Sequence, residues 1–106
     1  MSVQKATDEN FKKITESPNL TLIDFFGTWC APCKALSPVL ENLSEELKDK
    51  CTFYKLDIDS SPNTPTAMGV RGVPTLMLFR SGELVDQKVG FTDRANLHQW
   101  ITSNSN

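Results

Sequence analysis

The sequence predicts an α/β fold, with a single mixed sheet of five strands flanked by about four helices on both faces. Three observations support this prediction. Leu20–Phe26 is apolar on both faces, as expected of a central strand covered by helices on each side. Strand-like and helix-like segments alternate along the chain, which favours parallel strands joined by helical crossovers. Ser81-Gly82 forms a tight-turn pair between two strand-like segments, which adds an antiparallel hairpin.

The N-terminal region predicts one edge strand and one helix. Residues 1–6 can form a short strand around Val3. Thr7 offers a hydroxyl cap, and the acidic residues that follow it suit the positive end of a helix. Ser17-Pro18-Asn19 then ends this helix before the central strand begins.

The middle of the chain adds a long helix, a strand and a short helix. Apolar residues recur at helical spacing over about Ala31–Lys48. Cys51–Ile58 has the composition of the next strand, with Cys51 as a small buried hydrophobe. Pro65 lies near the start of a short helix, and Gly69 lies just past its end.

The C-terminal region predicts a pair of strands and a final helix. Leu76–Phe79 is an apolar strand, and the turn at Ser81-Gly82 sends Glu83–Val89 back in the antiparallel direction. Thr92-Asp93 caps the last helix, whose apolar residues recur at helical spacing.

Composition excludes several classes of function. A chain of 106 residues with 39% hydrophobic residues suits one domain, residues 1–106, with one core. The net charge of −2 and the absence of a basic patch argue against nucleic acid or an anionic membrane as partners. No apolar run approaches the ~20 residues of a membrane span, and no secretory signal follows Met1. The expected location is therefore a reducing cytoplasm.

Two cysteines at a strand-to-helix junction carry the predicted chemistry. Cys30 and Cys33 lie three positions apart, and residues at this spacing share one face of a helix. They can therefore reach the ~5.5–6 Å Cα separation that a disulfide needs. Cys30 lies near the helix start, where unpaired N–H groups and the helix dipole favour a thiolate. Cys33 lies inside the first turn and is expected to be more covered, so Cys30 attacks and Cys33 resolves.

Neighbouring residues can tune this pair. Pro32 suits the first turn, whose N–H groups have no helical partner to lose, and it stiffens the loop. Lys34 adds positive charge nearby. Two alternatives stay open, half of a zinc site and a structural disulfide. Zinc usually needs four ligands, for which Cys51 and His98 are the remaining candidates, and a loop this short gives a structural disulfide little entropic benefit.

Asp24 interrupts the apolar run of the central strand and is expected to be buried. Burial disfavours the charged carboxylate and raises its pKa, which suits a proton acceptor near neutral pH. Since Asp24 lies just upstream of the cysteines, it is predicted to take the proton of Cys33. Lys55, on another predicted strand, could pair with Asp24. The alternatives are a tolerated edge aspartate and a solvated lysine.

The chain resembles the thioredoxin family along essentially its whole length. A Cys-x-x-Cys pair alone is a weak signal, but the order of elements and the other matching segments make the combination specific. The segments that carry the resemblance are Ile23-Asp24-Phe25-Phe26, Trp29-Cys30-Ala31-Pro32-Cys33-Lys34, Lys55-Leu56-Asp57-Ile58-Asp59 and Arg71-Gly72-Val73-Pro74-Thr75-Leu76.

The resemblance implies a thiol–disulfide oxidoreductase that reduces protein disulfides and supports cell redox homeostasis. It implies that Pro74 is cis and faces the cysteines. Val73 and Thr75 would flank it, and Trp29 would border the same groove, where an extended client segment can pair as an added strand. An ordinary turn proline and a core tryptophan are the alternatives for Pro74 and Trp29.

The resemblance also implies how the protein is used. It needs no cofactor of its own, works as a monomer, and is recharged by an NADPH-dependent flavoprotein, thioredoxin reductase. Its implied clients are proteins such as ribonucleotide reductase, peroxiredoxins and methionine sulfoxide reductases. Two other functions stay open, an oxidant or isomerase with the same fold and a scaffold that uses the fold for binding.

Two positions depart from the family pattern. Ala31 stands where typical members have glycine. The two residues between the cysteines help to set the redox potential, so Ala31 is expected to affect it. Phe26 stands where many members have a second tryptophan, which is expected to affect packing under the active site more than chemistry.

Overall fold

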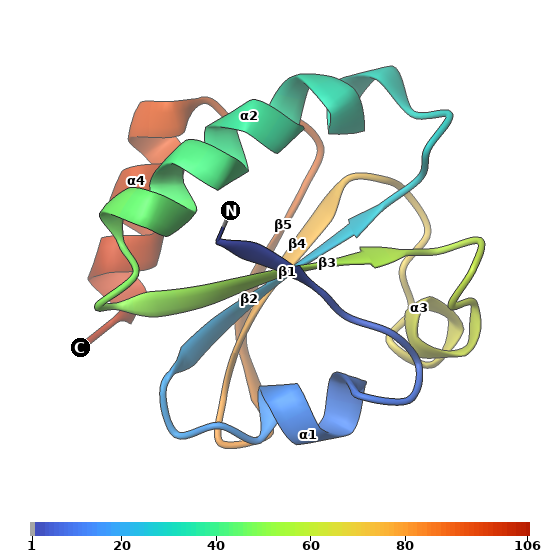
Figure 1. Ribbon diagram of the computed structural model, residues 1–106, viewed down its shortest axis with the longest axis horizontal. Helices are drawn as coiled ribbons and strands as arrows, with labels where there is room; N and C mark the ends of the chain where they lie inside the picture. The colour runs from blue at the N-terminus through green and yellow to red at the C-terminus, as the bar shows by residue number, and fades with distance from the viewer. Residues whose placement is uncertain (1) are drawn as a thin grey trace.

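The computed structural model describes residues 2–106, and over this range the chain forms one five-stranded sheet and four helices (Figure 1). The elements in chain order are β1 (Val3–Lys5), α1 (Phe11–Thr15), β2 (Leu20–Phe26), α2 (Ala31–Glu46), β3 (Cys51–Asp57), α3 (Asn63–Ala67), β4 (Thr75–Arg80), β5 (Glu83–Val89) and α4 (Arg94–Asn104). This is the predicted order of strands and helices. No helix within the described range is long and apolar enough to cross a membrane.

The strands lie side by side in the order β1-β3-β2-β4-β5. β3 pairs in parallel with both β1 and β2, whereas β4 pairs antiparallel with both β2 and β5. The apolar run Leu20–Phe26 is therefore the central strand, as predicted, and its first six residues are buried. The short strand around Val3 is an edge strand, also as predicted.

The direction of β4 differs from the prediction. Helical connections were expected to give parallel strands. This holds for the neighbours β2 and β3, joined through α2, and for β1 and β2, joined through α1, which run parallel on either side of β3. β4, however, follows α3 and runs antiparallel to β2. α3 stays at the end of the sheet where β1 and β3 end, because Asp8 in the loop after β1 accepts hydrogen bonds from Thr64. β4 therefore enters the sheet at the end where β3 leaves it.

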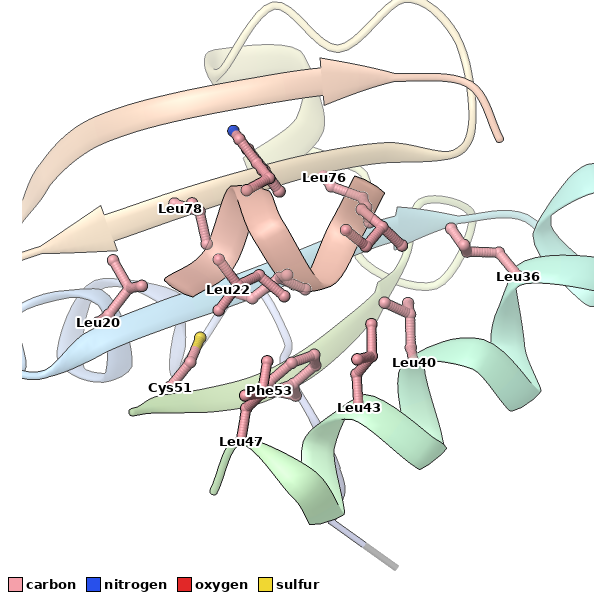
Figure 2. Packing of buried hydrophobic residues seen from close by; sticks show 13 residues of the cluster. Leu20, Leu22, Leu36, Leu40, Leu43, Leu47, Cys51, Phe53, Leu76 and Leu78 are labelled. Atoms are coloured by element: carbon pink, nitrogen blue, oxygen red, sulfur yellow. The ribbon is translucent and has the colours of Figure 1, made fainter. Parts of the chain in front are cut away.

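The core consists of two hydrophobic clusters on opposite faces of the sheet. The larger one packs α2 and α4 against one face, and Figure 2 shows its leucines converging on the strands. The smaller one packs α1 and the segment after α3 against the other face. Successive residues of a strand point to opposite faces, so Leu22 belongs to the first cluster and Ile23 to the second. Asp24 therefore shares the face of Leu22, the one that α2 covers.

α1 begins at Phe11, four residues after the predicted start at Thr7. The N-cap is Asn10 and not the predicted Thr7, whose Oγ1 accepts a hydrogen bond from the Asn10 backbone N–H at 3.3 Å in the turn before the helix. Asn10 Oδ1 in turn accepts from the Thr7 N–H at 2.7 Å. The residues between them form a turn, so the regular helix starts only after this reciprocal pair of bonds.

Asp8 was expected to stabilise the start of α1, but it contacts α3. Its carboxylate accepts hydrogen bonds from the Thr64 N–H at 2.8 Å and the Thr64 hydroxyl at 2.7 Å, and from the Asn63 N–H at 3.1 Å. The hydroxyl bond from Thr64 is the main reason why the pKa of Asp8 lies below its ordinary value. Asp8 thus fastens the short α3 to the loop before α1.

The C-terminal elements agree with the prediction. Ser81 and Gly82 have φ values of +54° and +83°, the left-handed pair that a tight hairpin requires. At the start of α4, the Asp93 side chain accepts a hydrogen bond from the Asn96 N–H at 2.9 Å. The predicted caps and turn therefore close the β4–β5 hairpin and begin the last helix.

Candidate functional site

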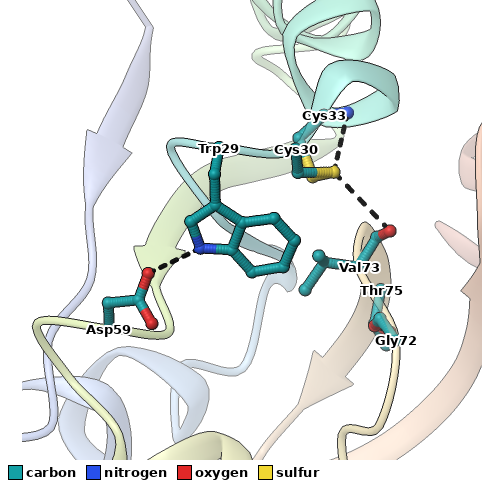
Figure 3. Close-up of a disulfide and its surroundings, with 7 residues drawn as sticks. All are labelled: Trp29, Cys30, Cys33, Asp59, Gly72, Val73 and Thr75. Carbon is teal, nitrogen blue, oxygen red and sulfur yellow. Dashed lines mark hydrogen bonds between the residues drawn. A yellow bond between two sulfur atoms is a disulfide. The ribbon is translucent and has the colours of Figure 1, made fainter.

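The cysteine pair lies where β2 leads into α2, as predicted. Cys30 is the N-cap of α2, and its extended backbone lets its sulfur accept the Cys33 backbone N–H at 3.2 Å. Pro32 occupies the first turn, where its missing N–H leaves no helical bond unmade. The two Cα atoms are 5.3 Å apart, and the sulfurs form a disulfide (Figure 3). The structure therefore shows the oxidised form of the pair.

The predicted difference in cover between the two cysteines is wrong. Cys30 is 5% exposed and Cys33 is 4% exposed, so both are buried. Cys30 is covered because the loop before β4 passes over it, with Val73 O 3.7 Å from Cys30 Sγ. What distinguishes Cys30 is its place at the helix end, where its sulfur receives a backbone N–H.

The loop over Cys30 contains the predicted cis proline. The peptide bond between Val73 and Pro74 is cis, and the Gly90 N–H donates to Pro74 O at 2.8 Å. Val73 is half-buried next to the sulfur, whereas Pro74 is buried. Thr75 is also buried, and its hydroxyl donates to Gly72 O, so its side chain supports the loop from behind. The structure thus brings Val73 to the disulfide and places Thr75 in the sheet.

Trp29 is a surface residue, so the alternative of a core tryptophan is wrong. Its side chain is 64% exposed, and Nε1 donates to Asp59 Oδ2 at 2.7 Å. Figure 3 shows the indole between Asp59 and Val73. Trp29 and Val73 line one groove of about 300 Å³ together with Ile58 and Pro65. Asp59 had no predicted functional role of its own and belonged only to a segment that carries the family resemblance. Its position just after β3 was the available signal.

Asp24 is buried as predicted, with 5% exposure. Burial raises its pKa to about 7, and the positive charge of Lys55 opposes this shift. Among the described residues, Asp24 Oδ1 has no hydrogen-bond partner. Asp24, Cys33 and Lys55 open onto one cavity of about 240 Å³, so the predicted acceptor and the predicted resolving sulfur share one space.

The wall of this cavity includes two residues for which the sequence predicted no role. Thr28 and Ser37, which received no role, contribute polar side chains to it. Phe26, one of the two departures from the family pattern, also lines it, and Lys55 Nζ lies 5.8 Å from the centre of the Phe26 ring. Phe26 therefore packs next to Asp24, and the effect of having phenylalanine rather than tryptophan there stays a prediction.

The two further zinc-ligand candidates lie away from the cysteine pair. Cys51 is buried in the larger cluster, and burial raises the pKa of its thiol to about 12. His98 lies on α4, where its Nε2 is 3.0 Å from Glu46 at the far end of α2. Within residues 2–106 no three or more His, Cys, Asp and Glu side chains form a metal-binding group. The structure thus keeps both candidates apart from Cys30 and Cys33.

Comparison with known proteins gives consistent results. Residues 2–103 match the family model of thioredoxin. The chain is 45% identical over 96 residues to a thioredoxin of Rickettsia felis, covering 90% of this chain and 91% of that protein. It is 43% identical over 101 residues to a thioredoxin of Staphylococcus saprophyticus, covering 95% and 96%. The crystal structure of a thioredoxin of Malassezia sympodialis, 37% identical, superposes with a TM-score of 0.91, covering 99% of this chain and 92% of that one.

Proposed function

Because this chain belongs to the thioredoxin family and is a thiol–disulfide oxidoreductase, we propose that it reduces protein disulfides, with Cys30 as the nucleophile and Cys33 as the resolving thiol. The observation that carries the assignment of roles is the position of Cys30 at the N-cap of α2. There its sulfur accepts a backbone N–H and lies at the positive end of the helix dipole, and both effects favour a thiolate.

The reaction begins with the reduced protein. The Cys30 thiolate attacks one sulfur of a client disulfide, and the other client sulfur leaves as a thiolate that takes up a proton. Cys33 then loses its proton, and its thiolate attacks Cys30 Sγ. This forms the Cys30–Cys33 disulfide and releases the second client sulfur as a thiolate. Two electrons pass from the two cysteines to the client. The 5.3 Å separation of their Cα atoms allows the disulfide to form with little movement of the backbone.

Asp24 is proposed as the group that accepts the proton of Cys33. Both side chains open onto the same cavity, and a carboxyl with a pKa of about 7 can take and return a proton near neutral pH. Lys55 is proposed to tune this carboxyl, since its charge lowers the pKa of Asp24. Ala31 and Pro32, which are exposed on the first turn between the cysteines, are proposed to tune the redox potential.

Clients are proposed to bind across the groove between Trp29 and the loop before β4. Val73 offers backbone groups beside the disulfide, with which an extended client segment can pair. Pro74 and Thr75 hold this loop in place, through the bond of Pro74 O with Gly90 and that of the Thr75 hydroxyl with Gly72. Trp29 supplies an exposed aromatic surface next to it.

The wider setting follows from the family. We propose that the chain acts as a single domain and a monomer in the cytoplasm, with its own disulfide as the redox group. An NADPH-dependent thioredoxin reductase would recharge it. Proteins such as ribonucleotide reductase, peroxiredoxins and methionine sulfoxide reductases would be its clients. The continuous sheet and its two clusters support the single domain.

A reductase-coupled assay on a protein disulfide tests the proposal. The wild-type protein should turn over, and Cys30→Ser should abolish reduction. Equilibration with glutathione tests the direction of electron flow, because a potential near the strong-oxidant value of about −120 mV would make the protein an oxidant instead. A protein that binds its partners equally well with and without Cys30, and reduces none of them, would be a scaffold.

A further inference from the structure

Gly27 lies directly against the indole of Trp29. A Cβ atom at position 27 would lie 2.6 Å from Trp29 Cε2, 2.8 Å from Cζ2 and 3.0 Å from Nε1. Carbon atoms in contact prefer separations of about 3.5–4.0 Å, so the indole can occupy this position only because residue 27 has no side chain. The three atoms nearest to this added Cβ all belong to Trp29.

The indole is also held at its nitrogen. Nε1, the atom that donates to Asp59 Oδ2 at 2.7 Å, is one of the three that contact the space above Gly27. The side chain is 64% exposed, and its indole packs between the bare backbone of Gly27 and the carboxylate of Asp59. With its nitrogen bonded to Asp59, the ring faces Val73 (Figure 3).

We propose that Gly27 is a positioning residue for client binding, because it fixes Trp29 as a preformed surface beside the disulfide. This inference rests on the proposed function, in which Trp29 borders the client groove. An aromatic side chain that is already ordered loses little conformational freedom when a partner binds, and so contributes more of its contact energy to affinity. The effect on binding should depend on the size of the substrate. A polypeptide disulfide extends far enough to contact the indole, whereas a small disulfide contacts only the sulfurs.

Gly27→Ala tests this arrangement without threatening the fold. The atoms that an alanine methyl would meet belong to an exposed, movable side chain, so the indole moves and the backbone stays. The first measurement is the indole N–H resonance of Trp29 in a ¹⁵N-labelled sample, assigned with Trp29→Phe. In Gly27→Ala this resonance should move to the position of a solvated indole as the bond to Asp59 is lost. The resonance of Trp100, which donates to Asp86, should not move.

The second measurement compares two substrates. For a protein disulfide, kcat/KM should fall by about threefold to tenfold through KM, the loss expected when one side chain must be ordered at binding. For 2-hydroxyethyl disulfide, kcat/KM should change by less than about twofold, since no polypeptide contacts the indole. Asp59→Ala, which releases the indole from its other side, should give the same pattern, and combining it with Gly27→Ala should add little.

A variant that lacks the indole shows whether Gly27→Ala acts through Trp29 or through the cavity next to Asp24. Gly27 also lines the Asp24 cavity, so an alanine there could act on the resolving step instead. In a Trp29→Ala background, Gly27→Ala should have no further effect on kcat/KM. A persisting loss there, an equal loss for both substrates, or an unmoved Trp29 resonance would each overturn the inference. A wild-type protein that reduces no protein disulfide would overturn the proposed function and the client-binding part of this inference, while the resonance would still decide whether Gly27 positions Trp29.

Discussion

Asp24 and Lys55 are register partners on the parallel strands β2 and β3, yet only Lys55 reaches solvent. Partners in register direct their side chains to the same face of a sheet, and α2 covers this face at Asp24. The aspartate is therefore buried beside an exposed lysine, in the wall of a cavity that Cys33 also lines. This arrangement leaves burial as the dominant influence on the pKa of Asp24, which is raised to about 7.

The first prediction concerns stability and pH. Between about pH 4 and pH 7 the folded protein keeps a proton on Asp24 that the unfolded chain has released, so the free energy of unfolding should fall as pH rises. The slope from this group is about 1.4 kcal/mol per pH unit, and the total loss is roughly 3–5 kcal/mol, complete above about pH 7. In Asp24→Asn this contribution should disappear, leaving the variant more stable than the wild type at neutral pH.

Urea unfolding of the oxidised proteins from pH 4 to pH 8 measures this difference. The same variant should reduce a protein disulfide more slowly, because Cys33 loses its proton acceptor. Asp49→Asn, at an exposed position after α2, serves as the control and should follow the wild-type curve. An Asp24→Asn protein that is less stable at pH 8 and equally fast would contradict the proposed role.

The second prediction concerns the lysine. Lys55→Met should raise the pKa of Asp24 above its value of about 7, because the charge that favours the carboxylate is removed. The ¹³C carboxyl resonance of Asp24, followed through a pH titration, reports this shift. Lys5→Met is the matched control, since Lys5 lies in register with Lys55 on the edge strand β1, one strand farther from Asp24. A pKa of Asp24 that is unchanged in Lys55→Met would show that the two charges do not interact.

The third prediction separates the two sulfurs. Cys33→Ser should accumulate a mixed disulfide between Cys30 and a client, because the resolving thiol is missing. Cys30→Ser should accumulate none, because the remaining Cys33 lacks the helix-end position that stabilises a thiolate. Non-reducing gel electrophoresis or mass spectrometry after incubation with a disulfide-containing protein measures the adduct. Comparable amounts of adduct from both variants would reverse or abolish the assigned order of attack.

The fourth prediction concerns Cys51. Its thiol has a pKa of about 12 because it is buried, so iodoacetamide should leave it unmodified in the folded protein at pH 7.5 and alkylate it in urea. Cys51→Ala should keep the wild-type rate of disulfide reduction. It should lower the free energy of unfolding by about 1 kcal/mol, comparable to the loss of one buried methyl group. Rapid alkylation of the native protein would instead show that this part of the core opens readily.

The elements that the sequence predicted correctly are those specified by neighbouring residues. An unbroken apolar run was enough to identify β2 as the central strand, and local caps and turn residues marked Ser81-Gly82 and Asp93. The direction of β4 was predicted wrongly because it depends on which end of the sheet holds α3, which helical periodicity does not reveal. Asp8 was misassigned for a similar reason, since its partner Thr64 lies 56 positions away.

In the site, too, features set by neighbouring residues were predicted, and those set by distant residues were not. Spacing along one helix was sufficient to predict the disulfide between Cys30 and Cys33, and the apolar neighbours of Asp24 were sufficient to predict its burial. The cover over Cys30 was not predictable from its neighbours, because Val73 reaches it from 43 positions further along the chain. The contact between Gly27 and Trp29 is local in sequence, but it depends on the rotamer of the indole.

The turn between the cysteines combines two buried sulfurs with an exposed dipeptide, Ala31-Pro32. Replacing either of these two residues changes the surroundings of the disulfide without disturbing the hydrophobic core, to which neither belongs. If this dipeptide tunes the redox potential, as proposed, the tendency of the protein to give up electrons can be adjusted by surface substitutions that leave the folded scaffold as it is.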